Sequence, residues 1–178
     1  MATKSRSFRP SLEVRNVSVS VQREAFDVGR EIAALTAGRH EIGAVASFVG
    51  LVRDISSSSD IAAGDSNPTA AMTLEHYPGM TERALGEIVA DAERRWELLA
   101  VRVIHRFGRL LPGDAIVLVI VAGRHRGGAF AACEFIMDFL KTQAPFWKKE
   151  EGADGREKAH WVDARESDDA AARRWNNP

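Results

Sequence analysis

Two apolar runs separated by a tight-turn sequence restrict the fold of this chain most. Residues 101–107 and 115–122 are rich in β-branched and aliphatic side chains, and Leu-Pro-Gly-Asp stands between them at 111–114. Runs of this kind predict strands, and a Pro-Gly-Asp turn between two strands predicts a hairpin. A hairpin is antiparallel, so the pair favours an α+β sheet over a doubly wound parallel one.

The other expected elements alternate strands with amphipathic helices. We predict further strands at 12–21 (irregular near Asn16), 43–52 and 71–77, with short extended pieces at 146–150 and 160–162. Helices are predicted at 27–36, 80–96, 127–142 and 167–175. Small and apolar residues fill 43–52 without alternation, which predicts a strand buried on both faces. The helix at 80–96 has an apolar stripe at i+4 steps: Met80, Ala84, Ile88, Ala92 and Trp96.

Length and composition bound the organisation of the chain. A chain of 178 residues fits a single domain, which we place at 11–178, after a flexible N-terminal arm at 1–10. Residues 55–68 are rich in Ser, Gly, Asp and Asn, and we expect a long flexible loop there. The 24 basic and 25 acidic side chains give a net charge of −1, which argues against a general nucleic-acid binder.

Several features favour a cytoplasmic protein without a membrane segment. The longest apolar run, 115–122, is too short to span a bilayer, and the first ten residues lack the apolar region of a secretory signal. Cys133 is the only cysteine, so no intramolecular disulfide can form, as is typical of a reducing compartment. It falls on the apolar side of the helix at 127–142, where we expect a core residue rather than a nucleophile.

Two lysines lie where a predicted helix gives way to an extended segment. Lys141 is in the last turn of the helix, and Lys148 follows Pro145 in the aromatic sequence Phe-Trp-Lys-Lys-Glu. An ammonium group can bind an anion, act as a base if its pKa falls, or attack a carbonyl. The alternative is that these lysines complement the helix dipole and face water.

Other cations cluster at strand ends. Arg53 ends one predicted strand, and Arg124, His125 and Arg126 stand between another strand and the N-terminus of the helix at 127–142. A helix N-terminus with guanidinium and imidazole groups can bind phosphate or carboxylate. The alternatives are a solvated basic loop and, for Arg53, an ion pair with a surface carboxylate.

The helix length separates two of these cations. Arg126 and Lys141 are fifteen residues apart, or about 22 Å along a helix, too far for one small ligand to contact both. Either they serve different sites, or a second subunit brings its Arg126 to the Lys141 of the first. We take the second as a hypothesis, with two identical composite sites in a two-fold dimer.

Motifs for metal or nucleotide binding are missing from the sequence. The histidines are scattered, and no spacing among them and Cys133 matches a zinc site. No glycine-rich phosphate loop is found either. We therefore expect no metal and no organic cofactor.

In their order and spacing, the motifs resemble the catalytic (large) subunit family of molybdopterin synthase. The matching segments are 43–54 (GAVASFVGLVRD), 74–80 (LEHYPGM), 105–108 (HRFG), 125–130 (HRGGAF), Lys141, 145–150 (PFWKKE) and 161–165 (WVDAR). The resemblance covers about residues 12–175. The Ser-rich 55–68 segment departs from it, since the family commonly has a short turn there.

The resemblance implies a fold, partners and a reaction. The implied fold is α+β and α/β-hammerhead-like, with a mixed or antiparallel sheet, packed helices and a small β-hairpin subdomain. The implied assembly is a homodimer carrying two copies of a small ubiquitin-like sulfur-carrier subunit, whose Gly-Gly C-terminus bears a thiocarboxylate. The implied reaction transfers two sulfur atoms to cyclic pyranopterin monophosphate to form molybdopterin, and needs no cofactor because the sulfur arrives on the partner.

The resemblance also implies a set of site residues. Lys141 and Lys148 would be catalytic, with His125 and Arg126 contributed by the neighbouring subunit. The full implied substrate-binding set is Leu51, Val52, Arg53, His125, Arg126, Lys141, Lys148, Lys149, Glu150 and Arg165. The residues alone leave open whether Lys141 acts as acid, base or nucleophile.

Two other functions remain open at the level of sequence. One is a non-catalytic docking module for a ubiquitin-like Gly-Gly tail, which the retention of both lysines with Arg53, His125 and Arg126 argues against. The other is a phosphate-ester hydrolase, for which no metal ligands or activated Ser or Cys nucleophile are evident.

Overall fold

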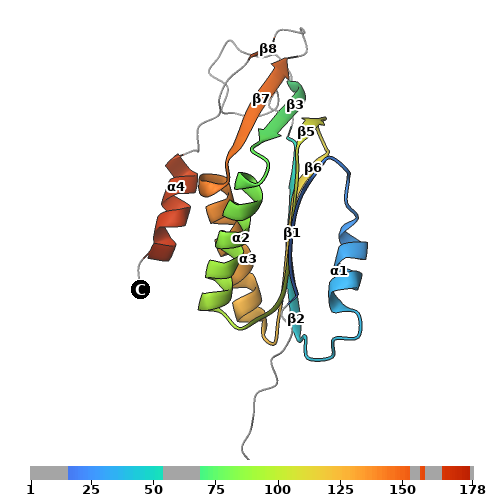
Figure 1. The fold of residues 1–178 in the computed structure, drawn as a ribbon, viewed down its shortest axis with the longest axis vertical. Coiled ribbons are helices and arrows are strands. Elements are labelled where there is room, and N and C mark those ends of the chain that lie inside the picture. The colour runs from blue at the N-terminus through green and yellow to red at the C-terminus, as the bar shows by residue number, and fades with distance from the viewer. Residues whose placement is uncertain (1–15, 54–68, 153–156, 159–165, 177–178) are drawn as a thin grey trace, which may run out of the picture.

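The described part of the chain forms two four-stranded sheets, with helices packed on both faces of the first (Figure 1). The computed structural model describes residues 16–53, 69–152, 157–158 and 166–176. The predicted arm at 1–10, the predicted loop at 55–68, the extended piece at 160–162 and Arg165 lie outside these residues. The mixed α+β class predicted from the sequence is confirmed.

The first sheet has the strand order β1-β4-β6-β2. Its strands are β1 (Asn16–Gln22), β2 (Ala44–Leu51), β4 (Leu98–Arg106) and β6 (Ala115–Gly123). The predicted pairing of the two apolar runs is confirmed, because β4 and β6 are antiparallel neighbours. The turn between them is also confirmed: Gly113 has a φ of 90°, and the Asp114 carboxylate accepts a hydrogen bond of 2.8 Å from the Leu111 amide.

The second sheet has the order β5-β3-β7-β8 and corresponds to the small β-hairpin subdomain that the family resemblance implies. Its strands are β3 (Thr69–His76), β5 (Gly108–Leu110), β7 (Phe146–Gly152) and β8 (Glu157–Lys158). Strand β5 is inserted into the connection between β4 and β6. The segment from β4 to β6 therefore contributes strands to both sheets. A small core of Val52, Met72, Leu74 and Leu110 packs beneath this sheet.

Helices cover both faces of the first sheet (Figure 1). Helix α2 (Met80–Arg95) and helix α3 (Arg126–Gln143) pack on one face, and α1 (Val28–Thr36) lies on the other. Helix α4 (Glu166–Arg173) packs against α3. Asp27 caps the N-terminus of α1, since its carboxylate accepts a 2.8 Å hydrogen bond from the Arg30 amide.

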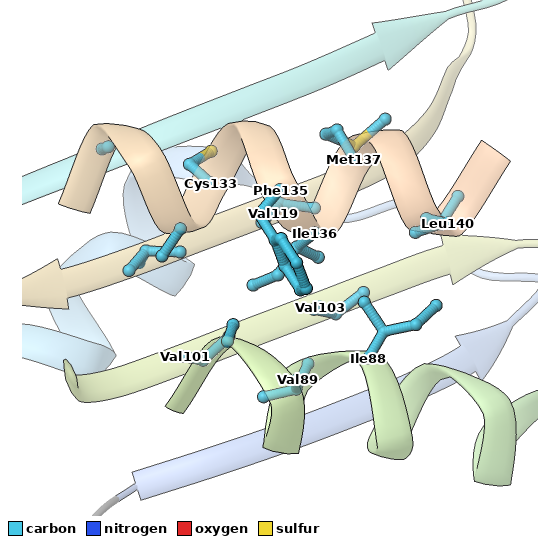
Figure 2. Packing of buried hydrophobic residues seen from close by; sticks show 14 of the residues in the cluster. Ile88, Val89, Val101, Val103, Val119, Cys133, Phe135, Ile136, Met137 and Leu140 are labelled. Atoms are coloured by element: carbon cyan, nitrogen blue, oxygen red, sulfur yellow. The ribbon is translucent and has the colours of Figure 1, made fainter. Parts of the chain in front are cut away.

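The main core lies between the first sheet and the α2–α3 layer (Figure 2). Val101, Val103, Val119 and Val121 point toward Phe135 and its neighbours, while the intervening residues of β4 and β6 face α1. The two central strands are therefore buried on both faces, which explains their unbroken apolar runs. Cys133 lies in the main core, as predicted.

The predicted burial of residues 43–52 on both faces is wrong. Strand β2 lies at the edge of the sheet, and Phe48, Val49 and Leu51 are 40%, 36% and 57% exposed. The run has the composition of a buried strand, yet among the described strands of the chain its only neighbour is β6. Composition does not distinguish burial within a chain from burial against another chain.

The predicted apolar stripe of α2 is also wrong in part. Ile88 and Ala92 are buried, but Met80 is 51% exposed, and the buried residues of the helix are Thr81, Leu85, Ile88, Val89 and Ala92. An i+4 step advances by more than one turn, so the straight stripe drifts away from the sheet over four turns.

Candidate functional site

The first group of predicted site residues surrounds the junction between α3 and β7. Pro145 cannot continue a helix and forces Ala144 into an extended conformation (φ −79°, ψ 125°), so that the chain leaves α3 and enters β7 within two residues. Lys141 is the basic residue of the last turn of α3, and Lys148 is the third residue of β7. The junction therefore brings the two predicted catalytic lysines to the same end of the molecule.

Lys141 is accessible from solvent. Its side chain is 51% exposed, and its Nζ lies 3.4 Å from the Asp168 carboxylate of α4. An ion pair this exposed is weak, so an incoming anion can compete for the ammonium.

Strand alternation separates the neighbours of Lys148. In the β3–β7 register Lys148 is opposite Leu74, Lys149 is opposite Thr73, and Glu150 is opposite Met72. Residues directly opposite each other share a face of a sheet. The Lys148 position is thus on the face of the sheet that covers the small core. The Glu150 position, two residues further along the strand, is on the same face, whereas Lys149 is on the other face.

Arg53 lies at the same end as the lysines. It is exposed and directly follows Val52, which is 4% exposed in the small core. The Val52 amide donates to the Asp114 carbonyl, and the Val52 carbonyl accepts from the Gly113 amide, each at 2.8 Å. The 111–114 turn therefore holds Val52 by both backbone groups and fixes where Arg53 leaves the sheet.

His125 and Arg126 lie at the opposite end of the first sheet. β6 ends at Gly123, α3 begins at Arg126, and both His125 and Arg126 are exposed. In the β2–β6 register Ala44 pairs with Gly123 and Leu51 with Ala115, so this end is about 25 Å from Arg53. We call these two places the lysine end (Arg53, Lys141, Lys148) and the histidine end (His125, Arg126).

The predicted separation of Arg126 from Lys141 is confirmed, because they lie in the first and last turns of one helix. A single chain therefore gathers Arg53, Lys141 and Lys148, and keeps His125 and Arg126 apart from them. The 18-residue helix adds its own field, since its N-terminal amides at the histidine end favour an anion.

Gly43 shapes the histidine end. Its amide donates to the Gly123 carbonyl at 3.1 Å, and a Cβ placed on Gly43 would overlap the carbonyl oxygen of Arg124. Only glycine allows this approach, so residue 43 sets the path of the chain into His125 and Arg126.

A Gly43→Ala substitution should therefore lower the free energy of unfolding by about 1–3 kcal/mol, the usual cost of forcing an extra carbon into a packed place. Gly86→Ala is the matched control, because a Cβ on Gly86 meets nothing within 4 Å. In the interior of α2 that change should stabilise by roughly 0.5–1 kcal/mol. Urea unfolding measures both, and equal midpoints for the two variants would contradict the tight approach.

Two buried imidazoles lie beneath the start of β7. The His105 ring stacks on Phe146 with centroids 3.7 Å apart, and His76 lies 6.4 Å from the same ring. The Nδ1 of His105 is 2.9 Å from the Arg106 carbonyl, which can only accept, so this nitrogen carries the proton. Desolvation lowers the pKa of His105 to about 4, and the imidazole is neutral in the folded protein.

Burial of neutral His105 makes stability depend on pH. The unfolded chain takes up a proton near pH 6.5 that folded His105 binds only near pH 4, so stability is full above pH 6.5 and falls as the pH drops toward 4. Between pH 7.5 and 5 the wild type should lose about 2 kcal/mol more than His105→Gln. Urea titrations at both pH values measure this, with His40→Gln as a control at an exposed histidine. Parallel losses in wild type and His105→Gln would contradict the prediction.

Cys133 does not belong to either group of site residues. It is 7% exposed, and burial raises the pKa of its thiol to about 11. A thiol held neutral in this way is a poor nucleophile. Within the described ranges no cluster of three or more His, Cys, Asp or Glu side chains could hold a metal ion. Over the same part of the chain, no helix is long and apolar enough to cross a membrane.

Sequence reasoning missed several residues around the lysine end. Asp168 contacts Lys141, and Thr81 and His105 pack at the α3–β7 junction. The acidic start of the last helix was visible in the sequence, but its contact with Lys141 depends on how α4 packs. No local signal marks Thr81, and the 105–108 motif, although it contains His105, gives no sign of the contact between His105 and Phe146.

Comparison with known proteins places this architecture in a defined class. A family model described as MoaE protein matches residues 21–143. A molybdopterin synthase catalytic subunit of Ralstonia nicotianae is 58% identical over 158 residues, covering 89% of this chain and 84% of the relative. The Pseudomonas aeruginosa protein of the same description is 52% identical over 159 residues, covering 89% and 99%.

Solved structures agree with the sequence relatives. The molybdopterin biosynthesis MoaE protein from Burkholderia ambifaria superimposes with a TM-score of 0.73 at 52% identity, covering 91% of this chain and 99% of the other. Fold and sequence thus define a two-sheet α+β protein of molybdopterin biosynthesis. The chain belongs to the MoaE protein family.

Proposed function

We propose that this chain is the catalytic subunit of a molybdopterin synthase. It transfers sulfur from the C-terminal thiocarboxylate of a small ubiquitin-like subunit to cyclic pyranopterin monophosphate. Family membership supports the activity. The observation that links this activity to particular residues is the placement of Lys141, Lys148 and Arg53 at one end of the fold.

The lysine end has the charge that the proposed donor requires. A thiocarboxylate is an anion, and two ammonium groups beside a guanidinium can hold it next to the acceptor carbon. In each transfer a C–S bond replaces a C–O bond, and a lysine ammonium protonates the departing oxygen. Water then cleaves the acyl–sulfur bond, and the small subunit leaves as a carboxylate.

The substrate's phosphate is assigned to the histidine end of a second subunit. His125, Arg126 and the N-terminal amides of α3 form a suitable phosphate site, but they are about 22 Å from Lys141 in the same chain. We therefore propose a homodimer in which the partner supplies His125 and Arg126 to each lysine end.

The edge of the first sheet supports this arrangement. β2 presents exposed Phe48, Val49 and Leu51, and natural proteins rarely leave an apolar edge strand uncovered. Two β2 edges facing each other about a two-fold axis would run antiparallel. The histidine end of one subunit would then lie beside the lysine end of the other, as the composite site requires.

The remaining predicted contacts stay proposals. Leu51 flanks Arg53 with an exposed side chain, Glu150 shares register parity with Lys148, and Arg165 lies outside the described residues. We also propose that the enzyme acts in the cytoplasm, since its single cysteine is free.

Molybdopterin formation tests the proposal directly. Purified protein is mixed with cyclic pyranopterin monophosphate and a thiocarboxylated small subunit, and the product is measured. Product that requires both proteins is the expected result. A bound small subunit with no product would instead favour a docking module.

A further inference from the structure

One buried hydroxyl joins the two turns that border the lysine end. Thr81 is fully buried near the start of α2, and its Oγ1 accepts a hydrogen bond from the Tyr77 amide at 3.2 Å. The same hydroxyl donates to the carbonyl of Pro145 at 3.3 Å, across 64 residues of sequence. Pro145 is the second of the two residues between α3 and β7, so Thr81 contacts the chain where it changes direction between Lys141 and Lys148.

Two ring contacts hold the residues that follow. Phe146 is stacked on His105 at 3.7 Å, and Trp147 meets Tyr77 edge-on at 4.0 Å. Three consecutive residues, 145 to 147, are thus each held by a different group, and two of those groups belong to the turn at 77–81. The same turn closes with amides of Met80 and Thr81 donating to the Tyr77 carbonyl at 3.1 and 3.0 Å.

The hydrogen bond between Thr81 and Pro145 tolerates less displacement than the two ring contacts. Stacked rings can slide by a few tenths of an ångström at little cost, whereas a hydrogen bond weakens steeply with distance and angle. Pro145 has no amide hydrogen, so its carbonyl is the group through which Thr81 can hold this residue. Loss of the hydroxyl would loosen the junction without removing either lysine from the chain.

We propose that Thr81 is a positioning residue for the sulfur transfer: its hydroxyl, through Pro145, sets the placement of Lys141 relative to Lys148. It is too deeply buried to touch substrate. The inference rests on the proposed sulfurtransferase activity, in which one anionic donor must meet both ammonium groups. A displacement of about 1 Å in such a pair can cost on the order of 100-fold in rate.

The test compares Thr81→Val with Thr81→Ser. Valine keeps the shape and removes the hydroxyl, whereas serine keeps the hydroxyl and loses a methyl group. We expect Thr81→Val to lower kcat at least tenfold, with KM and small-subunit affinity changed less than twofold. Thr81→Ser should recover kcat to within about threefold of wild type. Val103→Ala, in the main core, controls for lost stability and should keep kcat when assayed well below its own melting temperature.

A second readout does not depend on the reaction. The chain has five lysines (Lys4, Lys141, Lys148, Lys149 and Lys158), few enough for each to be assigned by Lys→Arg substitution after ¹³C-dimethylation. In the NMR spectrum of Thr81→Val, the signals of Lys141 and Lys148 should shift, and in Val103→Ala they should not.

The outcomes separate the two proposals. Unchanged kcat in Thr81→Val, loss of kcat without recovery in Thr81→Ser, or lysine signals that stay in place would each overturn the positioning role. If the wild type itself makes no molybdopterin, the sulfurtransferase proposal fails. The lysine signals then still decide whether Thr81 sets the placement of the two side chains.

Discussion

Lys141→Ala should reduce molybdopterin formation by at least about 100-fold, the contribution typical of a group that transfers a proton or neutralises developing charge. The ammonium lies at the exposed end of α3, where the proposed thiocarboxylate and acceptor carbon would meet. Folding should be little affected. The Lys141–Asp168 pair is 3.4 Å long with side chains 51% and 23% exposed, and such pairs contribute less than about 1 kcal/mol.

Two further variants show which property of Lys141 accounts for the lost turnover. Asp168→Asn removes the ion pair and keeps the ammonium, so turnover within severalfold of wild type would exclude the ion pair as the source of the effect. Lys141→Arg keeps the positive charge but not a readily transferred proton. Activity retained in Lys141→Arg would mean that the charge suffices, and its loss would favour acid–base or covalent chemistry. Near-normal product formation by Lys141→Ala would remove Lys141 from the mechanism.

The elements that local chemistry specifies could be predicted from the sequence. Asp27 caps α1, Pro145 ends α3, and Gly113 with Asp114 forms the turn between the apolar runs, each for a reason contained within a few residues. The alternation of hairpins and helices then indicated the mixed class. These features depend on neighbours in sequence, and the folded chain retains them.

The features that could not be predicted depend on contacts with residues far away in the sequence or in another chain. The run at 43–52 has the composition of a buried strand, but whether its outer edge is covered depends on a neighbour outside the chain. The insertion of β5 into the β4–β6 connection also has no local signal, because three residues pair with β3 only once both sheets have formed.

The candidate site likewise contains residues that the sequence identifies and residues that it does not. Lys141, Lys148, Arg53 and the His125–Arg126 pair could be identified as cations at element ends, and helix length alone separated Arg126 from Lys141. Thr81 could not be identified, since a lone threonine in an amphipathic helix gives no sign of a hydrogen bond to Pro145.

Mixing two inactive variants should restore activity if each site takes residues from both subunits. Lys141→Ala and His125→Ala subunits, exchanged at equal concentration, form about half heterodimers, and each heterodimer has one intact site and one doubly altered site. The mixture should therefore reach about one quarter of wild-type turnover, from parents that are each nearly inactive. A site confined to one subunit would leave every site with one lesion and restore nothing.

The matched control mixes Lys141→Ala with Lys148→Ala. Both changes fall at the lysine end of a single subunit, on either side of the α3–β7 junction, so no heterodimer has an intact site. This mixture should stay inactive under conditions in which native mass spectrometry shows full subunit exchange. Recovery in the first mixture alone requires His125 to act across the dimer, because only then do the two ends of α3, about 22 Å apart in one chain, meet at one substrate. No recovery in the first mixture despite proven exchange would contradict a site shared between the two subunits.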